Sequence, residues 1–195
     1  MQTSISTPLQ IQTLLPQSFS RRSLIPLYHQ RAWKIEVGIV RTLTWLEDGT
    51  VVPLGIWGSE DIVGGSLSQT SPYQIEALTD VKVRPLLLKD WQPSQEMFLN
   101  YLQHTQELMM IRSNRRAEDT LLKLLNWLAN KFGSEVGNGY LINCKLTHQD
   151  LAEFSGLTRV TVTRILSNLE QQGLIHRTSR QLVVIKDEEV WHYQI

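Results

Sequence analysis

The chain has 195 residues, of which 42% are hydrophobic, and its 19 Lys+Arg balance 19 Asp+Glu, so its net charge is zero. This length fits one full domain or two small ones, and the apolar content is too high for a disordered chain. No apolar run approaches the ~18 residues that a membrane helix needs, so we expect no membrane partner. Residues 1–8 lack a basic start followed by an apolar core, which argues against a signal peptide.

Cysteine and histidine usage limits the chemistry that the chain can perform. The single cysteine, Cys144, excludes an internal disulfide framework and a four-cysteine metal site, and it fits a reducing cytoplasm. Isolated histidines are more often core or surface residues than metal or haem ligands, so we expect no cofactor. These histidines are His29, His104, His148, His176 and His192. Because the chain also lacks a nucleophile elbow, a Walker loop and a dinucleotide fingerprint, the sequence predicts no catalytic residues and no enzyme.

The first half of the chain is patterned as β structure. Residues 32–37 and 39–46 place apolar side chains at roughly alternate positions, as half-buried strands do. Asp48-Gly49 tolerates the positive φ of a tight hairpin turn, and residues 50–57 supply the returning strand. Further short strands are expected in residues 74–78 and 81–84. Short strands with turn signals between them predict a small antiparallel barrel or sandwich.

Residues 94–132 contain no Gly and no Pro, and the period of the pattern lengthens there to that of helices. Ser94 is a candidate N-cap for a helix over residues 94–116. A heptad-like stripe follows one face of this helix at steps of four and three residues: Phe98, Leu102, Thr105, Met109 and Arg112. The helix either packs on its own barrel or forms a symmetric dimer interface, and we favour the dimer. A second amphipathic helix is expected over residues 117–132, with Gly133 at its end.

Two short helices separated by a tight turn follow in residues 145–173. Thr147 and Thr158 are candidate N-caps, and Gly156 supplies the turn between the helices. The second helix carries apolar side chains at the i, i+3, i+4, i+7 spacing of a buried stripe. That stripe consists of Val162, Ile165, Leu166 and Leu169. The pattern is typical of a helix-turn-helix.

The other face of the second helix is polar and cationic, with no acidic residue before Glu170. Arg and Thr near a helix N-terminus suit entry into the major groove, where base edges offer acceptors and thymine methyls. Residues 174–185 are typical of a hairpin with a basic tip, a wing. Residues 145–186 hold six basic and three acidic side chains, a local cationic patch on a neutral chain. These features predict binding to double-stranded DNA.

The alternative is a dimeric scaffold whose winged helix binds protein instead of DNA. Contacts to phosphates release counterions, so binding to duplex DNA weakens steeply as salt rises. An interaction insensitive to salt would favour the scaffold.

Residues 145–185 resemble the winged helix of the CRP/FNR superfamily of bacterial transcription regulators. Thr158-Arg-Val-Thr-Val-Thr-Arg-Ile-Leu166 closely resembles the recognition helix of the cyanobacterial global nitrogen regulators in that superfamily. Residues 33–41 and 58–65 are more weakly similar to its sensor domain. The resemblance implies an α+β fold in three parts. These are a truncated cyclic-nucleotide-binding-like jelly-roll barrel over 1–93, a dimerisation helix over 94–116 and a winged-helix DNA-binding domain over 117–195.

The resemblance also implies a function: a homodimer that inserts two recognition helices into successive major grooves of a palindrome with GTA/TAC-like half-sites. RNA polymerase is the further partner expected of such a regulator. Base contacts are expected from Arg159, Val160, Thr161 and Arg164. Phosphate contacts are expected from Thr147, His148, Gln149, Thr158, Thr163, Arg177 and Arg180.

The sensor half departs from the family's cyclic-nucleotide binders, which hold the cyclic phosphate with an arginine. The corresponding stretch here begins Gly64-Gly65-Ser66-Leu67 and lacks that arginine, so we expect no cAMP binding. The arginines implied by similarity to the 2-oxoglutarate-sensing nitrogen regulators are also missing, because Ser71 and Gln103 stand near their positions. Arg112, Arg115 or Arg116 could substitute. The effector is unknown: the domain either works without a ligand or binds an unidentified small anion.

Overall fold

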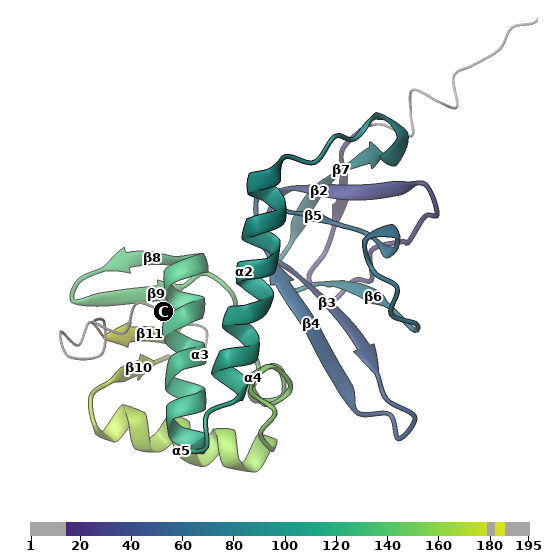
Figure 1. The fold of residues 1–195 in the computed structure, drawn as a ribbon. Helices are drawn as coiled ribbons and strands as arrows, with labels where there is room; N and C mark the ends of the chain where they lie inside the picture. Colours follow the sequence, from purple (N-terminus) through teal and green to yellow (C-terminus); the bar gives the residue numbers. More distant parts are fainter. Residues whose placement is uncertain (1–14, 179–181, 186–195) are drawn as a thin grey trace, which may run out of the picture. The chain divides into compact units, whose positions relative to one another are not determined.

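The computed structural model describes residues 15–178 and 182–185 of the chain (Figure 1). Within these residues the chain divides into two compact units. One comprises residues 15–45 and 56–93, and the other comprises residues 46–55 together with the described residues from 94 onward. No helix among them is long and apolar enough to cross a membrane.

The antiparallel strands between residues 17 and 87 lie in two sheets and build the first unit, apart from residues 51–55, which are grouped with the second unit. One sheet has the order β1-β7-β2-β5, and the other has the order β4-β3-β6. The first sheet contains β1 (Gln17–Phe19), β7 (Val81–Leu87), β2 (Arg31–Val37) and β5 (Ile62–Val63). The second contains β4 (Val51–Trp57), β3 (Val40–Trp45) and β6 (Gln74–Ala77). Short 3-10 helices lie at η1 (Gly65–Leu67) and η2 (Leu88–Asp90).

The expected small antiparallel barrel or sandwich is present as two sheets, and the described strands do not form a closed barrel. The central pairing is β2 with β7, in which Trp33 lies opposite Pro85 and Ile35 opposite Val83. The register shifts between Ile35 and Val37, as at a β-bulge, which bends a strand. The alternating pattern of residues 32–37 and 39–46 correctly predicted β2 and β3.

Apolar side chains from the strands fill the interior of this unit. The Trp33 indole is almost fully buried, meets the Phe19 ring edge-on at 6.2 Å and donates its N–H to the Pro26 carbonyl at 2.7 Å. The Trp57 N–H likewise donates to the Thr42 hydroxyl at 3.0 Å. Both large indoles therefore bury their area while their polar atoms stay hydrogen-bonded.

The second unit contains four α-helices and a four-stranded antiparallel sheet of order β10-β11-β9-β8. The helices are α2 (Gln95–Arg112), α3 (Ala117–Phe132), α4 (His148–Ser155) and α5 (Arg159–Gln171). The strands are β8 (Gly133–Val136), β9 (Gly139–Ile142), β10 (Ile175–Arg177) and β11 (Leu182–Ile185). Figure 1 shows α5 packed across the end of α3 and leading into β10.

Helix α2 ends four residues before the predicted boundary at residue 116. The Ser113 hydroxyl donates to the Met109 carbonyl at 2.8 Å. The Asn114 side-chain amide donates to the carbonyls of Met110 and Ile111 at 3.2 and 2.9 Å. These side chains satisfy carbonyls that a continuing helix would have used, and so they terminate it.

Candidate nucleic-acid interface

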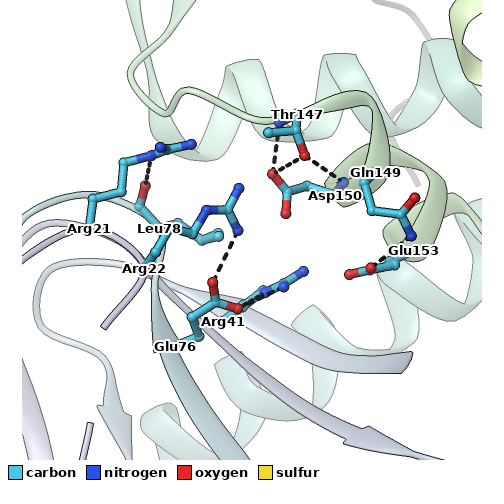
Figure 2. Close-up of polar contacts among 9 residues, drawn as sticks. All are labelled: Arg21, Arg22, Arg41, Glu76, Leu78, Thr147, Gln149, Asp150 and Glu153. Atoms are coloured by element: carbon cyan, nitrogen blue, oxygen red, sulfur yellow. Dashed lines mark hydrogen bonds and ion pairs between the residues drawn. The ribbon is translucent and has the colours of Figure 1, made fainter. Parts of the chain in front are cut away.

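The helix-turn-helix forms where local signals in the sequence place it. Thr147 begins α4 with a capping box, in which its hydroxyl accepts from the Asp150 N–H at 3.1 Å and Asp150 accepts from the Thr147 N–H at 2.7 Å (Figure 2). Gly156 ends α4 in the left-handed conformation at φ 73°, which suits glycine. The Thr158 hydroxyl begins α5 by accepting from the Thr161 N–H at 3.1 Å. All three expected boundary residues therefore have the expected roles.

Helix α5 divides cleanly into a buried and an exposed face. Its predicted apolar stripe is buried: Val162, Ile165, Leu166 and Leu169. Val160, by contrast, is 79% exposed. Leaving so large an aliphatic side chain in water gives up the free energy that burial would supply. Val160 is therefore accessible for contact with a partner.

The two arginines of the exposed face are available for contacts. Arg159 and Arg164 are exposed, and within the described part of the chain neither guanidinium has a hydrogen bond or an ion pair. Arginine presents a planar fork of donors that matches acceptors such as guanine O6 and N7. This face therefore presents two guanidinium groups whose N–H donors could bind acceptors in a groove of DNA.

The threonine hydroxyls on the same helix already have partners. The Thr161 and Thr158 hydroxyls lie 2.8 Å apart. The Thr163 hydroxyl donates to the Arg159 carbonyl at 2.9 Å and lies 2.8 Å from His148 Nδ1. Because the Thr163 hydrogen is used in this way, Nδ1 of His148 acts as the donor of that second bond.

His148 joins the first residue of α4 to the recognition helix. Burial lowers the pKa of His148 below its usual value, and the charges of Arg177 and Arg159 lower it further. A neutral imidazole here links α4 to Thr163 of α5, beside two cations. Its position at the amino end of α4 agrees with the expected role at a phosphate, which stays a prediction.

The wing arginine Arg177 is not free, in contrast to Arg159 and Arg164. Its Nε and Nη2 donate to Glu170 at 3.0 and 2.6 Å, and Nη2 lies 3.4 Å from the Ser167 hydroxyl. Its backbone N–H donates to the other Glu170 oxygen at 3.1 Å. The second expected wing cation, Arg180, lies outside the described residues.

Sequence reasoning missed the contacts that hold the carboxyl end of α5. The Asn168 amide donates to both carboxylate oxygens of Glu118 on α3 at 3.1 Å, and Gln172 donates to the same carboxylate at 3.3 Å. Glu118 lies 50 residues away in the chain, so no local pattern links it to Asn168. The only sequence signal for these contacts was the presence of amide side chains, Asn168 and Gln172, near the end of α5.

The predicted dimer stripe is exposed along α2. Phe98, Leu102 and Met109 are 56%, 55% and 60% exposed, and Thr105 is exposed beside them. The helix buries a different face within its own unit, consisting of His104, Leu108 and Ile111. Arg112 belongs to the stripe, and the structure brings its guanidinium close to Gly156: a Cβ on that glycine would lie 3.5 Å from Nη2. Gln149, expected at a phosphate, donates to Glu153 at 2.9 Å (Figure 2).

Among the described residues of the first unit, which corresponds to the expected sensor domain and is called the sensor unit below, one guanidinium is buried, that of Arg41. Its Nε and Nη2 both bind the Glu76 carboxylate at 2.7 Å, and Arg22 binds the other oxygen of Glu76 at 3.1 Å (Figure 2). A charge-assisted pair of this kind accounts for burying the two groups together. The Gly64-Gly65 segment approaches β2, because a Cβ on Gly64 would lie 3.0 Å from the Ala32 Cα. The structure describes no cluster of three or more His, Cys, Asp or Glu side chains that could hold a metal in residues 15–178 and 182–185.

Three features define a winged-helix DNA-binding protein. A β domain precedes the helix-turn-helix in the sequence, a strand hairpin follows it, and its second helix has an exposed cationic face. Comparisons with known proteins identify the family. A model of the Crp-like helix-turn-helix domain matches residues 118–190. The chain is 39% identical over 196 residues to regulatory protein CysR of Synechococcus elongatus, covering 97% of this chain and 91% of that protein.

Two further comparisons agree with this. The chain is 35% identical over 80 residues to the global nitrogen regulator of Synechocystis sp., covering 41% of this chain and 36% of that one. The structure of FixK2 from Bradyrhizobium japonicum matches with a TM-score of 0.75 at 20% identity, covering 91% of this chain and 95% of that chain. The chain belongs to the CRP/FNR family and is a DNA-binding transcription regulator, not an enzyme.

Proposed function

We propose that the protein acts as a homodimer that reads a palindromic DNA site with GTA/TAC-like half-sites and does so without cAMP. The observation that carries the proposal is the exposed face of α5. There the guanidinium groups of Arg159 and Arg164 have no hydrogen bond or ion pair within the described residues, and Val160 stands 79% exposed beside them. The three-part division at residues 93/94 and 116/117 is part of this proposal.

In this proposal Arg159 and Arg164 bind base edges, with guanine O6 and N7 as the preferred acceptors. Val160 contacts a thymine methyl, and Thr161 completes the groove contacts. Thr158 holds Thr161 in place through the hydroxyl pair at 2.8 Å. The helix therefore enters the groove with its side chains already ordered, which lowers the entropy that binding costs.

The amino ends of α4 and α5 supply the phosphate contacts. Thr147, His148 and Gln149 stand at the start of α4, where the helix dipole favours an anion. Thr158 stands at the corresponding position of α5, and Thr163 is bonded to His148 between the two helices. Arg180 extends the positive surface in the proposal.

The partner for the exposed stripe of α2 is a second copy of the chain. The stripe repeats at steps of four and three residues, which is the spacing of a two-helix seam. An 18-residue helix is about 27 Å long at 1.5 Å per residue. A two-fold pairing along this helix would present two copies of α5, as a palindrome with half-sites about 34 Å apart requires.

Independence from cAMP is supported by the contents of the sensor unit. Its core cluster consists of apolar side chains that pack against one another: Ile25, Trp33, Ile35, Val40, Trp57, Val63, Ile75, Ala77, Val81 and Val83. The buried Arg41 already binds Glu76. A cyclic phosphate in this interior would have to displace a carboxylate from that arginine, at the cost of an unpaired buried charge. RNA polymerase is the further partner in this proposal.

A selection from a random duplex library, performed with the full chain and without added ligand, tests the proposal. The expected result is a palindrome with GTA and TAC arms whose affinity falls steeply with salt, since each phosphate contact contributes about −0.9 to the log–log slope. Addition of cAMP should change neither the affinity nor the thermal midpoint. Enrichment of no sequence, or binding insensitive to salt, would overturn the proposal and favour a protein partner.

A further inference from the structure

The side-chain pair of Glu170 and Arg177 joins strand β10 of the wing to α5. Three hydrogen bonds link the two residues, at 2.6, 3.0 and 3.1 Å, and the third uses the backbone N–H of Arg177. The side chains are 35% and 23% exposed. The guanidinium also reaches the Ser167 hydroxyl at 3.4 Å, on the exposed face of α5. Arg177 therefore lies over the helix that carries the free arginines.

Helix stability does not explain an acidic residue at position 170. Glu170 lies in the last turn of α5, where the helix dipole disfavours negative charge, and it is the first acidic residue on the helix. A carboxylate there would also repel phosphates. Hydrogen bonding to Arg177 lowers the pKa of Glu170, so the group is fully ionised at neutral pH. The negative charge is thus tolerable on this surface only while Arg177 neutralises it.

The two donor groups of Arg177 that form its fork, Nε and Nη2, both face Glu170. A bidentate phosphate contact through this Nε–Nη2 edge would require the pair to break, and while the pair holds only the outer Nη1 side of the guanidinium keeps unused donors. Arg159 and Arg164 have no such competitor within the described residues. The pair accordingly separates Arg177 from the cations that remain available to DNA.

We propose that Arg177 is a positioning residue that fixes the wing strand β10 to the carboxyl end of α5 and neutralises Glu170, and that it is not a phosphate ligand. This inference rests on the proposed DNA-binding function and revises the expected phosphate contact of Arg177. It follows that the position of the wing against the DNA duplex depends on the Glu170–Arg177 pair and not on the arginine alone.

Affinity for the selected operator is measured by fluorescence anisotropy from about 50 to 200 mM salt for Arg177→Ala, Glu170→Ala and the double variant. Arg177→Ala should bind about tenfold more weakly, because it leaves Glu170 unpaired on the DNA-facing side. The double variant should recover most of that loss and keep the wild-type salt slope. Equal weakness of Arg177→Ala and the double variant, with a slope smaller by about 0.9, would show a phosphate ligand and overturn the proposal.

The pair formed by Arg84 and Glu36 offers a matched control. It has a similar side-chain geometry, with Nε and Nη2 of Arg84 at 2.6 Å from one oxygen of Glu36, but it lies in the sensor unit. Arg84→Ala makes the same change in net charge as Arg177→Ala and should leave operator affinity unchanged. A tenfold loss in Arg84→Ala as well would show that net charge alone produces the effect and would overturn the positioning role.

Hydrogen exchange of the Arg177 amide provides a readout that needs no DNA. This amide donates to Glu170, so Glu170→Ala should speed its exchange while the α5 amides stay protected. If the exchange rate of the Arg177 amide is the same in Glu170→Ala and the wild type, the Glu170–Arg177 pair does not hold the wing strand. A wild-type chain that binds no duplex but shows this exchange result would refute the proposed function and leave the pair intact.

Discussion

Single side chains on α5 differ in what they are free to do. The hydroxyls of Thr158, Thr161 and Thr163 are bonded within the helix-turn-helix, whereas the guanidinium groups of Arg159 and Arg164 are not, within the described residues. Bonded hydroxyls fix the geometry of a surface, while free arginines can form new bonds to a partner. In our proposal the arginines therefore contact the bases, and the threonines hold the helix-turn-helix in shape.

Arg159→Ala tests this assignment. We expect a loss of about 1–3 kcal/mol in binding free energy for the operator and relaxed preference at one base pair of each half-site. Anisotropy titrations against operators with single base changes measure both effects. Lys89→Ala, which removes an exposed cation from the sensor unit, is the control. Uniform weakening across all the duplexes would instead place Arg159 at a phosphate.

His104 couples the stability of the second unit to pH. Its ring is 2% exposed, meets the Trp127 indole edge-on at 5.0 Å and contacts the Lys131 ammonium through Nδ1. Burial, assisted by Lys131, lowers the pKa of His104 to about 3. The folded state thus holds the neutral ring at pH values where the unfolded chain binds a proton, so stability falls as pH falls below about 6.5.

The expected slope is about 1.4 kcal/mol per pH unit between pH 6.5 and 3, or about 2 kcal/mol lost by pH 5. His104→Gln keeps an acceptor for Lys131 and removes the titrating group. Urea unfolding at pH 7 and pH 5 should therefore show about 2 kcal/mol less acid destabilisation in the variant. The same pH dependence in both proteins would show that His104 is not held neutral.

Among whole elements, α5 depends on its cap as well as on its buried stripe. Thr158→Ala removes the hydroxyl that accepts from the Thr161 N–H and should cost about 1 kcal/mol of unfolding free energy. Thr158→Ser keeps a hydroxyl and should retain most of the stability. Urea titrations of the two variants give the comparison. A loss as large in the serine variant would assign the effect to packing of the threonine methyl.

Helix α2 carries the dimer in our account, because its stripe is the exposed apolar seam. Leu102→Arg places a charge on the stripe of each copy, where the two charges would face one another across the seam. We expect the dimer to dissociate in sedimentation experiments and operator affinity to fall by at least about tenfold. Asn100→Arg adds the same charge at an exposed position away from the stripe. If Leu102→Arg stays dimeric, the dimer interface lies on a surface other than this stripe.

How far the sequence predicted these elements depends on how local their signals are. The capping threonines and Gly156 fixed the helix-turn-helix boundaries, because caps act within one turn. Strands β1 and β5, of three and two residues, were missed, since such lengths hold too little periodicity. The sequence left a barrel and a sandwich open, because alternation along strands does not reveal how sheets pair. The bonds from Glu170 to Arg177 and from Glu118 to Asn168 arise only after the chain folds.

For the whole molecule, the net charge is zero although the charges are distributed unevenly along the sequence. Residues 145–186 hold six basic and three acidic side chains, whereas the full chain is balanced. A local cationic patch on a neutral protein limits non-specific binding to polyanions while it supports a specific site. Under the proposed function, regulation would act through the placement of two copies of α5, since the exposed face of α5 is already formed in one chain.

The central claim is that Arg159 and Arg164 read guanines in successive major grooves. Dimethyl sulfate methylates guanine N7 in that groove, so protection from methylation tests the claim directly. The account predicts two clusters of protected guanines about one helical turn apart on the operator, each lost in Arg159→Ala/Arg164→Ala. Tight binding by the wild type with no protected N7, or protection that persists in the double variant, would contradict it.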